Sequence, residues 1–281
     1  EVVGLFTPGN HDWGNMVGDE GRARLANEEA MLTRARAQGL RVELLPGGGF
    51  PGPVVRDLGP AVRLVFIDTN LVLQEPTGDW HDEFFAGISS ALLGAAGRQT
   101  IVLAHHPLRS AGPHGALVPA MNAMGLLYLF KKSGTLIQDL NSPVFSVFLE
   151  RLREAFAAGG GPPLVVAGGH DHSLQVLSPR ESGDPPHLLV SGAGSKLTDI
   201  AVVPGLRMGL SRPGFMALVF RRGGGVQLRV FAGGPGDQHC PVGVQGPGSE
   251  AARARLDRCL HRSAAAFRVV YAEDLSPVEG R

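Results

Sequence analysis

The amino-acid sequence predicts a layered α/β fold in a single domain. Short apolar runs alternate with helix-spaced segments as far as His172, and short strand-like runs without long helices follow. Alternation first and strands later is typical of one layered domain rather than two separate ones. The length of 281 residues, with 43% hydrophobic content, is sufficient for a buried core.

The first part of the chain contains four apolar runs that we interpret as buried strands, each bounded by Gly, Pro or a polar loop. They are Val2–Phe6, Val62–Ile67, Thr100–Ala104 and Leu164–Ala167. Apolar residues at helical spacing predict helices over Glu20–Gln38, Asp82–Ala95 and Val144–Ala158. Asp82 and Ser142 are of the residue types that begin helices.

The second part of the chain is predicted to be mainly β. Its strand-like runs are Leu174–Leu177, His187–Val190, Phe215–Phe220 and Val226–Phe231. A helix over Ser249–Arg262 and a last strand near Phe267–Tyr271 complete the prediction.

The composition excludes several classes of protein. Lys+Arg and Asp+Glu both total 26, so the formal charge is zero, and this balance argues against nucleic acid as a partner. The 40 Gly and 21 Pro show no Gly-X-Y period, which excludes a collagen-like chain. Because no uninterrupted apolar run reaches the ~18 residues of a membrane span, we expect no transmembrane segment.

The sequence leaves the compartment open. Cys240 and Cys259 either form a disulfide, which needs an oxidising, extracytoplasmic compartment, or remain two unpaired thiols. The chain starts at Glu1 inside a strand-like segment, with neither Met nor a signal peptide. We therefore expect a processed or truncated product whose localisation signals are missing.

Three polar clusters directly follow three of the predicted strands. They are Gly9-Asn10-His11-Asp12, His105-His106-Pro107 and Gly169-His170-Asp171-His172. Because ligands of α/β sheets gather at the carboxyl ends of strands, three strand ends can converge on one point. Neutral imidazole, with amide or carboxylate oxygen, suits Zn, Fe, Mn and related ions.

Each cluster also has an ordinary structural interpretation. An isolated Asn-His-Asp is usually a turn, His-His-Pro is usually a strand exit, and His-x-His after a strand is compatible with a solvated loop. The three together, in this order and each at a strand end, favour a metal site.

The same clusters lie in longer sequence blocks, Phe6–Trp13, Val102–Pro107 and Gly168–His172. Supporting matches occur at Phe66–Thr69, Ser191–Gly194 and Gly112-Pro113-His114. Together they resemble the later signature blocks of the calcineurin-like metallophosphoesterases, with the purple acid phosphatase branch nearest. The resemblance covers roughly Val2 to Val203. It implies a layered α/β/β/α sandwich that hydrolyses a phosphate ester through a dinuclear metal centre and a metal-bound hydroxide.

The resemblance also implies a set of metal ligands. Asn10, through its side-chain oxygen, would bind one metal together with His105 and His170, and His172 would bind the other. The two ions would be divalent or trivalent, with Fe, Zn and Mn all left open. Two such ions neutralise the charge of the phosphoryl group and lower the pKa of bound water.

Four further residues would serve the substrate according to the same resemblance. His11 would face the leaving-group oxygen, with Asp12 orienting its ring and favouring its protonated form. His114 would lie at the substrate edge, where it would contact the phosphate or assist departure of the leaving group. His106 would either lie behind the metal ligands and support the substrate-binding side of the site, or only pack in the protein interior. The substrate would be a phosphorylated small molecule or a lipid-like phosphate ester.

Two blocks that begin the family, Asp-x-His and Gly-Asp-x-x-Asp, are absent before Gly9. Literal matches at Gly78–Asp82 and Asp237–His239 fall elsewhere, and truncation is a simpler interpretation than circular permutation. We therefore expect a single domain over 1–281 that lacks its first β-α-β unit. It would carry an apolar insertion at 115–141 and a C-terminal extension at 238–281. The remaining residues offer three ligands for one metal and one for the other.

Three functions remain as hypotheses. The first is a metal-dependent phosphoesterase, the second a degenerate phosphoesterase-like scaffold that binds a partner or one metal and is inactive as this fragment. The third is a hydrolase that acts through a single metal. Within the insertion, the nearly uncharged stretch Ala116–Phe130 is either an apolar lid over the site or a packed helix.

Overall fold

The computed structural model describes residues 2–15, 17–116, 138–194, 196–222, 224–233 and 267–275. Its helices are α1 (Gly18–Ala37), α2 (Thr69–Gln74), α3 (His81–Leu93) and α5 (Pro143–Ala158). Its strands are β1 (Gly4–Phe6), β2 (Val42–Leu44), β3 (Val54–Leu58), β4 (Val62–Phe66), β5 (Gln99–Leu103), β6 (Val165–Gly168), β7 (Leu174–Leu177), β8 (His187–Ser191), β9 (Leu206–Leu210), β10 (Gly214–Phe220), β11 (Val226–Ala232) and β12 (Arg268–Leu275).

A mixed seven-stranded sheet forms the centre of the molecule, in the order β3-β4-β5-β6-β8-β7-β9. The four neighbours β4, β5, β6 and β8 run parallel, whereas β3 and β7 run antiparallel to the strands beside them. All four residues of β7 are buried, as are the first four of β8. Burial along successive residues is typical of strands that are covered on both faces.

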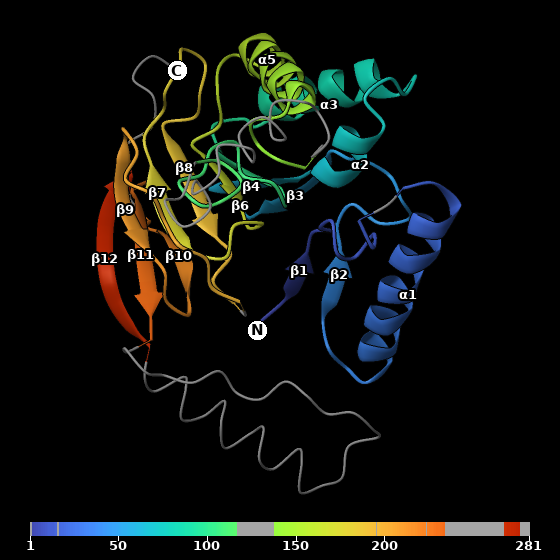
Figure 1. Ribbon diagram of the computed structural model, residues 1–281, viewed down its shortest axis with the longest axis horizontal. Coiled ribbons are helices and arrows are strands. Elements are labelled where there is room, and N and C mark those ends of the chain that lie inside the picture. The colour runs from blue at the N-terminus through green and yellow to red at the C-terminus, as the bar shows by residue number, and fades with distance from the viewer. Residues whose placement is uncertain are drawn as a thin grey trace, which may run out of the picture.

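Two layers provide that cover (Figure 1). Helices α3 and α5 lie on one face of the central sheet, where Phe84 and Phe156 pack against Val102. The antiparallel sheet β10-β11-β12 lies on the other face. Strand β11 alternates buried and half-buried residues, so that Leu228 and Val230 join Val165 in a second core. The described residues therefore form the α/β layers that the sequence predicts.

Strands β1 and β2 and helix α1 form a separate unit beside these layers (Figure 1). The parallel pair β1-β2 is a sheet of its own. The prediction of a buried strand at Val2–Phe6 is therefore wrong in its burial: Val2 is 91% exposed and Phe6 48% exposed. An apolar run indicates a strand, but burial of that strand depends on layers that cover it.

Most predicted elements are confirmed within two residues at their ends. Ser142 begins α5 as expected, because its hydroxyl accepts a hydrogen bond from the Phe145 backbone N–H at 3.1 Å. Asp82 does not begin α3, since the residue before this helix is Trp80 and Asp82 lies in its first turn. A carboxylate there still faces the positive end of the helix dipole.

Several sequence predictions lie outside the described residues. They concern the Cys240–Cys259 pair, the helix over 249–262 and most of the 115–141 insertion. Within the described part of the chain, no helix combines the length and apolar character that crossing a bilayer requires.

Candidate metal centre

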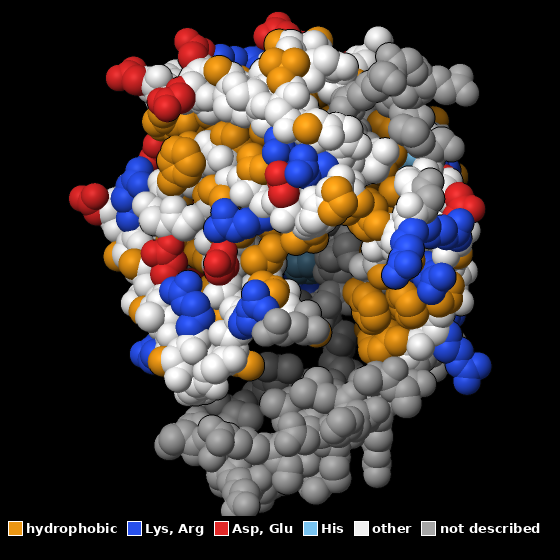
Figure 2. All heavy atoms as spheres, turned by 180° about the vertical axis from the view of Figure 1, so that it is seen from behind, with side chains coloured by type: hydrophobic (Ala, Val, Ile, Leu, Met, Phe, Trp, Pro, Cys, Tyr) orange, Lys and Arg blue, Asp and Glu red, His pale blue; other side chains and the backbone are white. Residues whose placement is uncertain are grey.

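The central strands place two of the three predicted clusters at one edge of the sheet, and the third, which contains Asn10, follows β1 of the separate two-stranded sheet. Strands β4, β5 and β6 are parallel neighbours, so their carboxyl ends lie side by side. His105 and His106 follow β5, and His170 follows β6. Figure 2 shows a histidine side chain at the bottom of a hollow in the middle of the face drawn. This edge is where ligands bind in open α/β sheets.

Three residues from distant parts of the chain meet there. The Nε2 atom of His105 lies 2.7 Å from the Oδ1 atom of Asn10 and 3.1 Å from the Nδ1 atom of His170. One ring nitrogen from each of His105, His106 and His170 lies within 4.8 Å of the others. These four side chains therefore surround a single point, and we call them the histidine cluster.

The cluster favours uncharged imidazole rings. Burial, followed by the charges of neighbouring histidines, lowers the pKa of His105 to about 4 and that of His170 to about 2. Burial also holds the pKa of His106 well below its usual value. All three rings are thus neutral near pH 7, which is the form that binds metal ions.

Buried nitrogen atoms without a hydrogen-bond partner indicate whether the cluster can hold a cation. Among the described residues, the Nε2 atoms of His106 and His170 and the Nδ1 atom of His172 are buried without a hydrogen-bond partner. A buried polar atom without a partner costs about 1–3 kcal/mol, and such atoms commonly mark an ion or a water that completes the site. Imidazole nitrogen with one amide oxygen is also a suitable donor set for Zn, Fe or Mn. The residues present fit a bound metal ion.

The loop that carries Asn10 is shaped by close packing. A Cβ atom at position 9 would lie 2.5 Å from the Nδ1 atom of His105. Only glycine at this position therefore allows the loop to pack so closely against the His105 ring. The Asn10 amide nitrogen donates to the Oδ1 atom of Asn15 at 2.8 Å. This bond assigns the amide nitrogen to Asn15 and leaves the amide oxygen facing His105.

Replacing Gly9 by Ala is expected to weaken metal binding roughly 10–100-fold, the effect seen when a group that orients a ligand is lost. The new methyl group would displace the His105 ring. Calorimetric titration with Zn²⁺ measures the change. Gly225→Ala is the matched control, because position 225 lies in the β10–β11 hairpin and meets only Arg221 at 3.9 Å. Equal zinc affinity in the two variants would show that the glycine does not position the ligand.

A buried hydrogen bond fastens the same loop to the sheet. The Trp13 indole Nε1–H donates to the Oδ2 atom of Asp68 at 2.8 Å, and both side chains are fully buried. The other oxygen of Asp68 accepts from the Asn70 and Leu71 backbone N–H groups and thereby begins α2. Burial raises the pKa of Asp68 to about 6. Asp68 and Trp13 belong to the blocks Phe66–Thr69 and Phe6–Trp13, but the sequence alone indicated no role for either side chain.

Thr69 supports the cluster from behind. Its hydroxyl oxygen accepts from the His106 backbone N–H at 3.0 Å and lies 2.9 Å from the Nδ1 atom of the same residue. The His106 ring is fully buried, and its centroid is 4.3 Å from that of His170. Thr69 thus fixes the ring plane of His106 and leaves its Nε2 atom free.

His114 and His172 lie at the rim. The His114 ring centroid is 4.1 Å from that of His170, and the His114 backbone N–H donates to Asp171 at 3.3 Å. His172 is half-buried, and its ring nitrogens are not part of the group that surrounds the central point. Burial, followed by the charge of Lys196, lowers the pKa of His172.

His11 and Asp12 follow Asn10 in the same loop. His11 is exposed, and its charge lowers the pKa values of His105 and His172, which shows that it lies near both. The Asp12 carboxylate accepts from the Gly9 backbone N–H at 2.7 Å, so its described hydrogen bond is to its own loop.

Acidification is expected to destabilise the metal-free protein below pH 6.5. Unfolded histidines take up protons there, whereas His105 stays neutral down to about pH 4 and His170 to about pH 2. The unfolded state then binds more protons, so each group lowers the free energy of unfolding by up to about 1.4 kcal/mol per pH unit. Between pH 6 and 3.8 Asp68 acts in the opposite sense, because its raised pKa lets the folded state bind its proton first.

Urea unfolding in EDTA between pH 8 and 5 measures this dependence. His105→Gln should give a shallower decline than the unsubstituted protein, because one of the depressed groups is gone. Parallel curves for the two proteins would contradict the assignment.

No family model and no curated protein matches the sequence. The structure of PhoD superimposes with a TM-score of 0.52 and 10% identity, over 95% of this chain and 51% of that one. The chain has a distant phosphoesterase-like fold.

Two further solved structures are similar over a smaller share of this chain. A purple acid phosphatase, PPD1 from yellow lupin seeds, gives a TM-score of 0.39 at 17% identity, over 63% of this chain and 29% of that one. GAP50, the anchor in the inner membrane complex of Plasmodium, gives 0.45 at 15% identity, over 81% and 54%. The chain thus spans about half the length of PhoD and GAP50 and less than a third of the lupin enzyme.

Proposed function

We propose that this protein is a metal-dependent phosphoesterase. The observation that carries the proposal is the meeting of Asn10, His105 and His170 around one point, although they follow three different strands. The neutral rings and their unpaired buried nitrogens support it, because both are needed to hold a cation. The phosphoesterase-like fold adds support from a separate direction.

Asn10, His105 and His170 would hold one metal ion, with His106 directly behind them. His172 would contribute to a second ion. When bound, the ions would supply Lewis acidity against the negative charge of a phosphoryl group. That chemistry makes a phosphate monoester or diester the fitting substrate class.

The chain's own side chains would perform the remaining steps. His11, which is exposed, would give a proton to the leaving-group oxygen. His114, whose ring centroid lies 4.1 Å from that of His170, would contact the phosphate. Trp13 and Asp68 would act indirectly, because they hold the Asn10 loop against the sheet.

A second candidate is a scaffold that binds one metal ion without turnover. It is favoured by the donor count, since the described residues form one group of three histidines, and His172 lies outside that group. A dinuclear centre needs further oxygen or nitrogen donors for its second ion.

Metal analysis and turnover measured on one preparation distinguish the two candidates. Protein reconstituted with Zn²⁺, Mn²⁺ or Fe²⁺ is assayed with p-nitrophenyl phosphate and bis(p-nitrophenyl) phosphate. About two ions per chain with turnover is the expected result. One ion without turnover of either compound would replace the phosphoesterase by the scaffold, and no bound ion would overturn both.

A further inference from the structure

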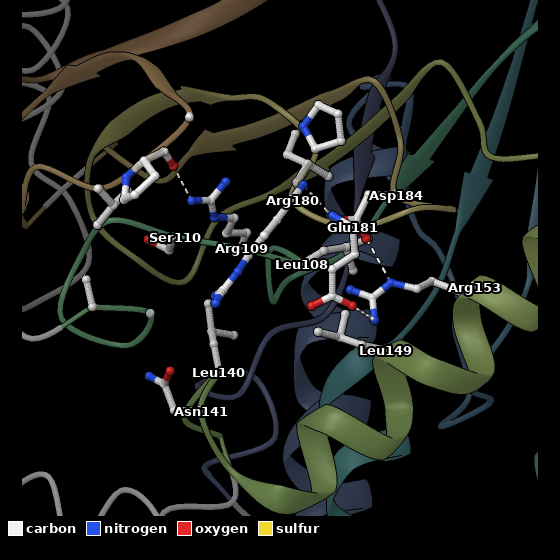
Figure 3. Close-up of a pocket in the computed structure, with 17 residues that line it drawn as sticks. Leu108, Arg109, Ser110, Leu140, Asn141, Leu149, Arg153, Arg180, Glu181 and Asp184 are labelled. Carbon is white, nitrogen blue, oxygen red and sulfur yellow. Dashed lines mark hydrogen bonds and ion pairs between the residues drawn. The ribbon is translucent and has the colours of Figure 1, made fainter. Parts of the chain in front are cut away.

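A second cavity lies apart from the histidine cluster (Figure 3). It has a volume of about 720 Å³ and is lined by residues of α5, of β8 and of the loops that follow β5 and β7. None of the residues of the histidine cluster lines it. Its volume lies within the ~300–1,000 Å³ that is usual for small-molecule sites.

Much of the cavity wall is apolar. Its larger apolar side chains are Leu108, Leu140, Leu149, Leu188 and Val203. They come from separate segments, and the walls of the cavity therefore offer a hydrophobic surface to the body of a ligand.

Both carboxylates that line the cavity already have ion-pair partners. Asp184 pairs with the Arg153 Nε atom at 2.8 Å, and Glu181 pairs with another nitrogen of the same guanidinium at 3.0 Å. The second oxygen of Asp184 accepts the backbone N–H groups of Arg180 and Glu181, each at 3.0 Å. Arg153 is thus neutralised, and both acidic side chains are occupied.

The guanidinium groups of half-buried Arg109 and exposed Arg180 also line the cavity. Among the described residues, neither Arg109 nor Arg180 forms an ion pair. Arg109 donates only to backbone carbonyls, those of Ser178 at 3.2 Å and of Pro204. In Figure 3 the Arg180 side chain extends from its loop toward Leu140 on the opposite wall.

The environment of Arg109 makes this charge unfavourable without a partner. Burial, followed by the like charge of Arg180, lowers the pKa of Arg109, and the charge of Asp184 opposes this only in part. An anion between the two guanidinium groups would relieve both effects. Guanidinium groups bind carboxylate and phosphate oxygens through paired, charge-assisted hydrogen bonds.

We propose that this cavity binds an amphiphilic anion, whose carboxylate or phosphate group is held by Arg109 and Arg180 and whose apolar body lies against the leucine-lined wall. An anion without an apolar body would make no contact with the apolar wall. A neutral apolar molecule would form no ion pair with the guanidinium groups of Arg109 and Arg180. The site does not depend on the proposed hydrolysis, because none of its residues belongs to the histidine cluster.

Calorimetry on the metal-free protein tests the proposal with three probes of equal chain length. Decanoate and decyl phosphate should each bind with one site, and their comparison shows which head group is preferred. Decanol, acetate and inorganic phosphate should bind at least about tenfold more weakly, a difference of ~1.4 kcal/mol. Failure of both ten-carbon anions to bind would overturn the proposal.

Matched variants locate the site. Arg180→Gln should weaken decanoate binding about tenfold, whereas Arg222→Gln, an exposed arginine in the β10–β11 hairpin, should not. Leu149→Gln should weaken it severalfold, and Val147→Gln, two residues away on α5 and 56% exposed, should leave it unchanged. Thermal unfolding checks that each variant is folded. Unchanged affinity in Arg180→Gln and Leu149→Gln would place any binding elsewhere and contradict the proposal.

Discussion

Replacing His105 by Ala is expected to abolish stoichiometric metal binding and to lower phosphoesterase turnover by more than about 100-fold. Loss of a group that merely orients a ligand costs 10–100-fold, and His105 is placed to be a ligand itself. Its Nε2 atom contacts both Asn10 and His170, so its removal breaks the cluster at its centre. Metal content by mass spectrometry and turnover of p-nitrophenyl phosphate measure the two effects.

A buried histidine elsewhere provides the control for this variant. His81 lies in α3, where its Nε2 atom contacts the Glu75 carbonyl oxygen at 2.7 Å and its ring stacks on Trp80. His81→Gln should therefore keep the full metal content. If His105→Ala retained as much metal as His81→Gln, the cluster would not be the metal site.

Replacing Trp13 by Ala is expected to destabilise the fold by about 3–5 kcal/mol, the usual cost of deleting a large buried aromatic side chain. Trp13 is fully buried with Leu25 of α1 and Leu71 of α2. The substitution also removes the N–H donor of Asp68, whose carboxyl group is completely buried. Urea unfolding followed by circular dichroism gives the free energy.

Trp13→Phe separates the two contributions. It keeps most of the apolar volume but leaves one oxygen of Asp68 without its donor, for which we expect a cost of about 1–3 kcal/mol. Asp68→Asn in the Trp13→Phe background should restore part of the loss, since a neutral amide is less costly to bury than a carboxylate. A Trp13→Ala variant as stable as the parent would mean that the loop does not depend on this contact.

The sequence predicted the central layers well because their strands are covered on both faces. The mainly apolar segment Leu174–Leu177 coincides with an observed strand to the residue. Strand β3, Val54–Leu58, was not predicted, because it carries the polar residues Arg56 and Asp57 and is half-buried at best. Helix α2 was not predicted because its six residues are too few to show a helical pattern. Its N-terminus is stabilised by hydrogen bonds to the Asp68 side chain, which are visible only in the structure.

The histidine cluster was predictable for a related reason. His105 and His170 follow the neighbouring parallel strands β5 and β6, so their meeting follows from topology. Asn10 also stands just after a strand, but that strand belongs to a separate sheet, so its contact with His105 does not follow from the same rule. The contacts that orient these side chains could not be predicted from the sequence. Thr69 behind His106, and Asn15 beside Asn10, are joined to their partners by side-chain geometry that no spacing indicates.

The unit formed by β1, β2 and α1 contributes Asn10, whereas the central sheet contributes His105 and His170. Two separate sheets, joined by the Trp13–Asp68 hydrogen bond, therefore contribute to one constellation of donors. A cation that engages Asn10 together with the imidazoles would stabilise the attached state over a partly detached one, by a free energy that rises with the logarithm of its concentration over its dissociation constant. Amide hydrogen exchange in α1, which contributes none of the donor atoms, should slow as zinc is added, so that this helix reports on occupancy of the site.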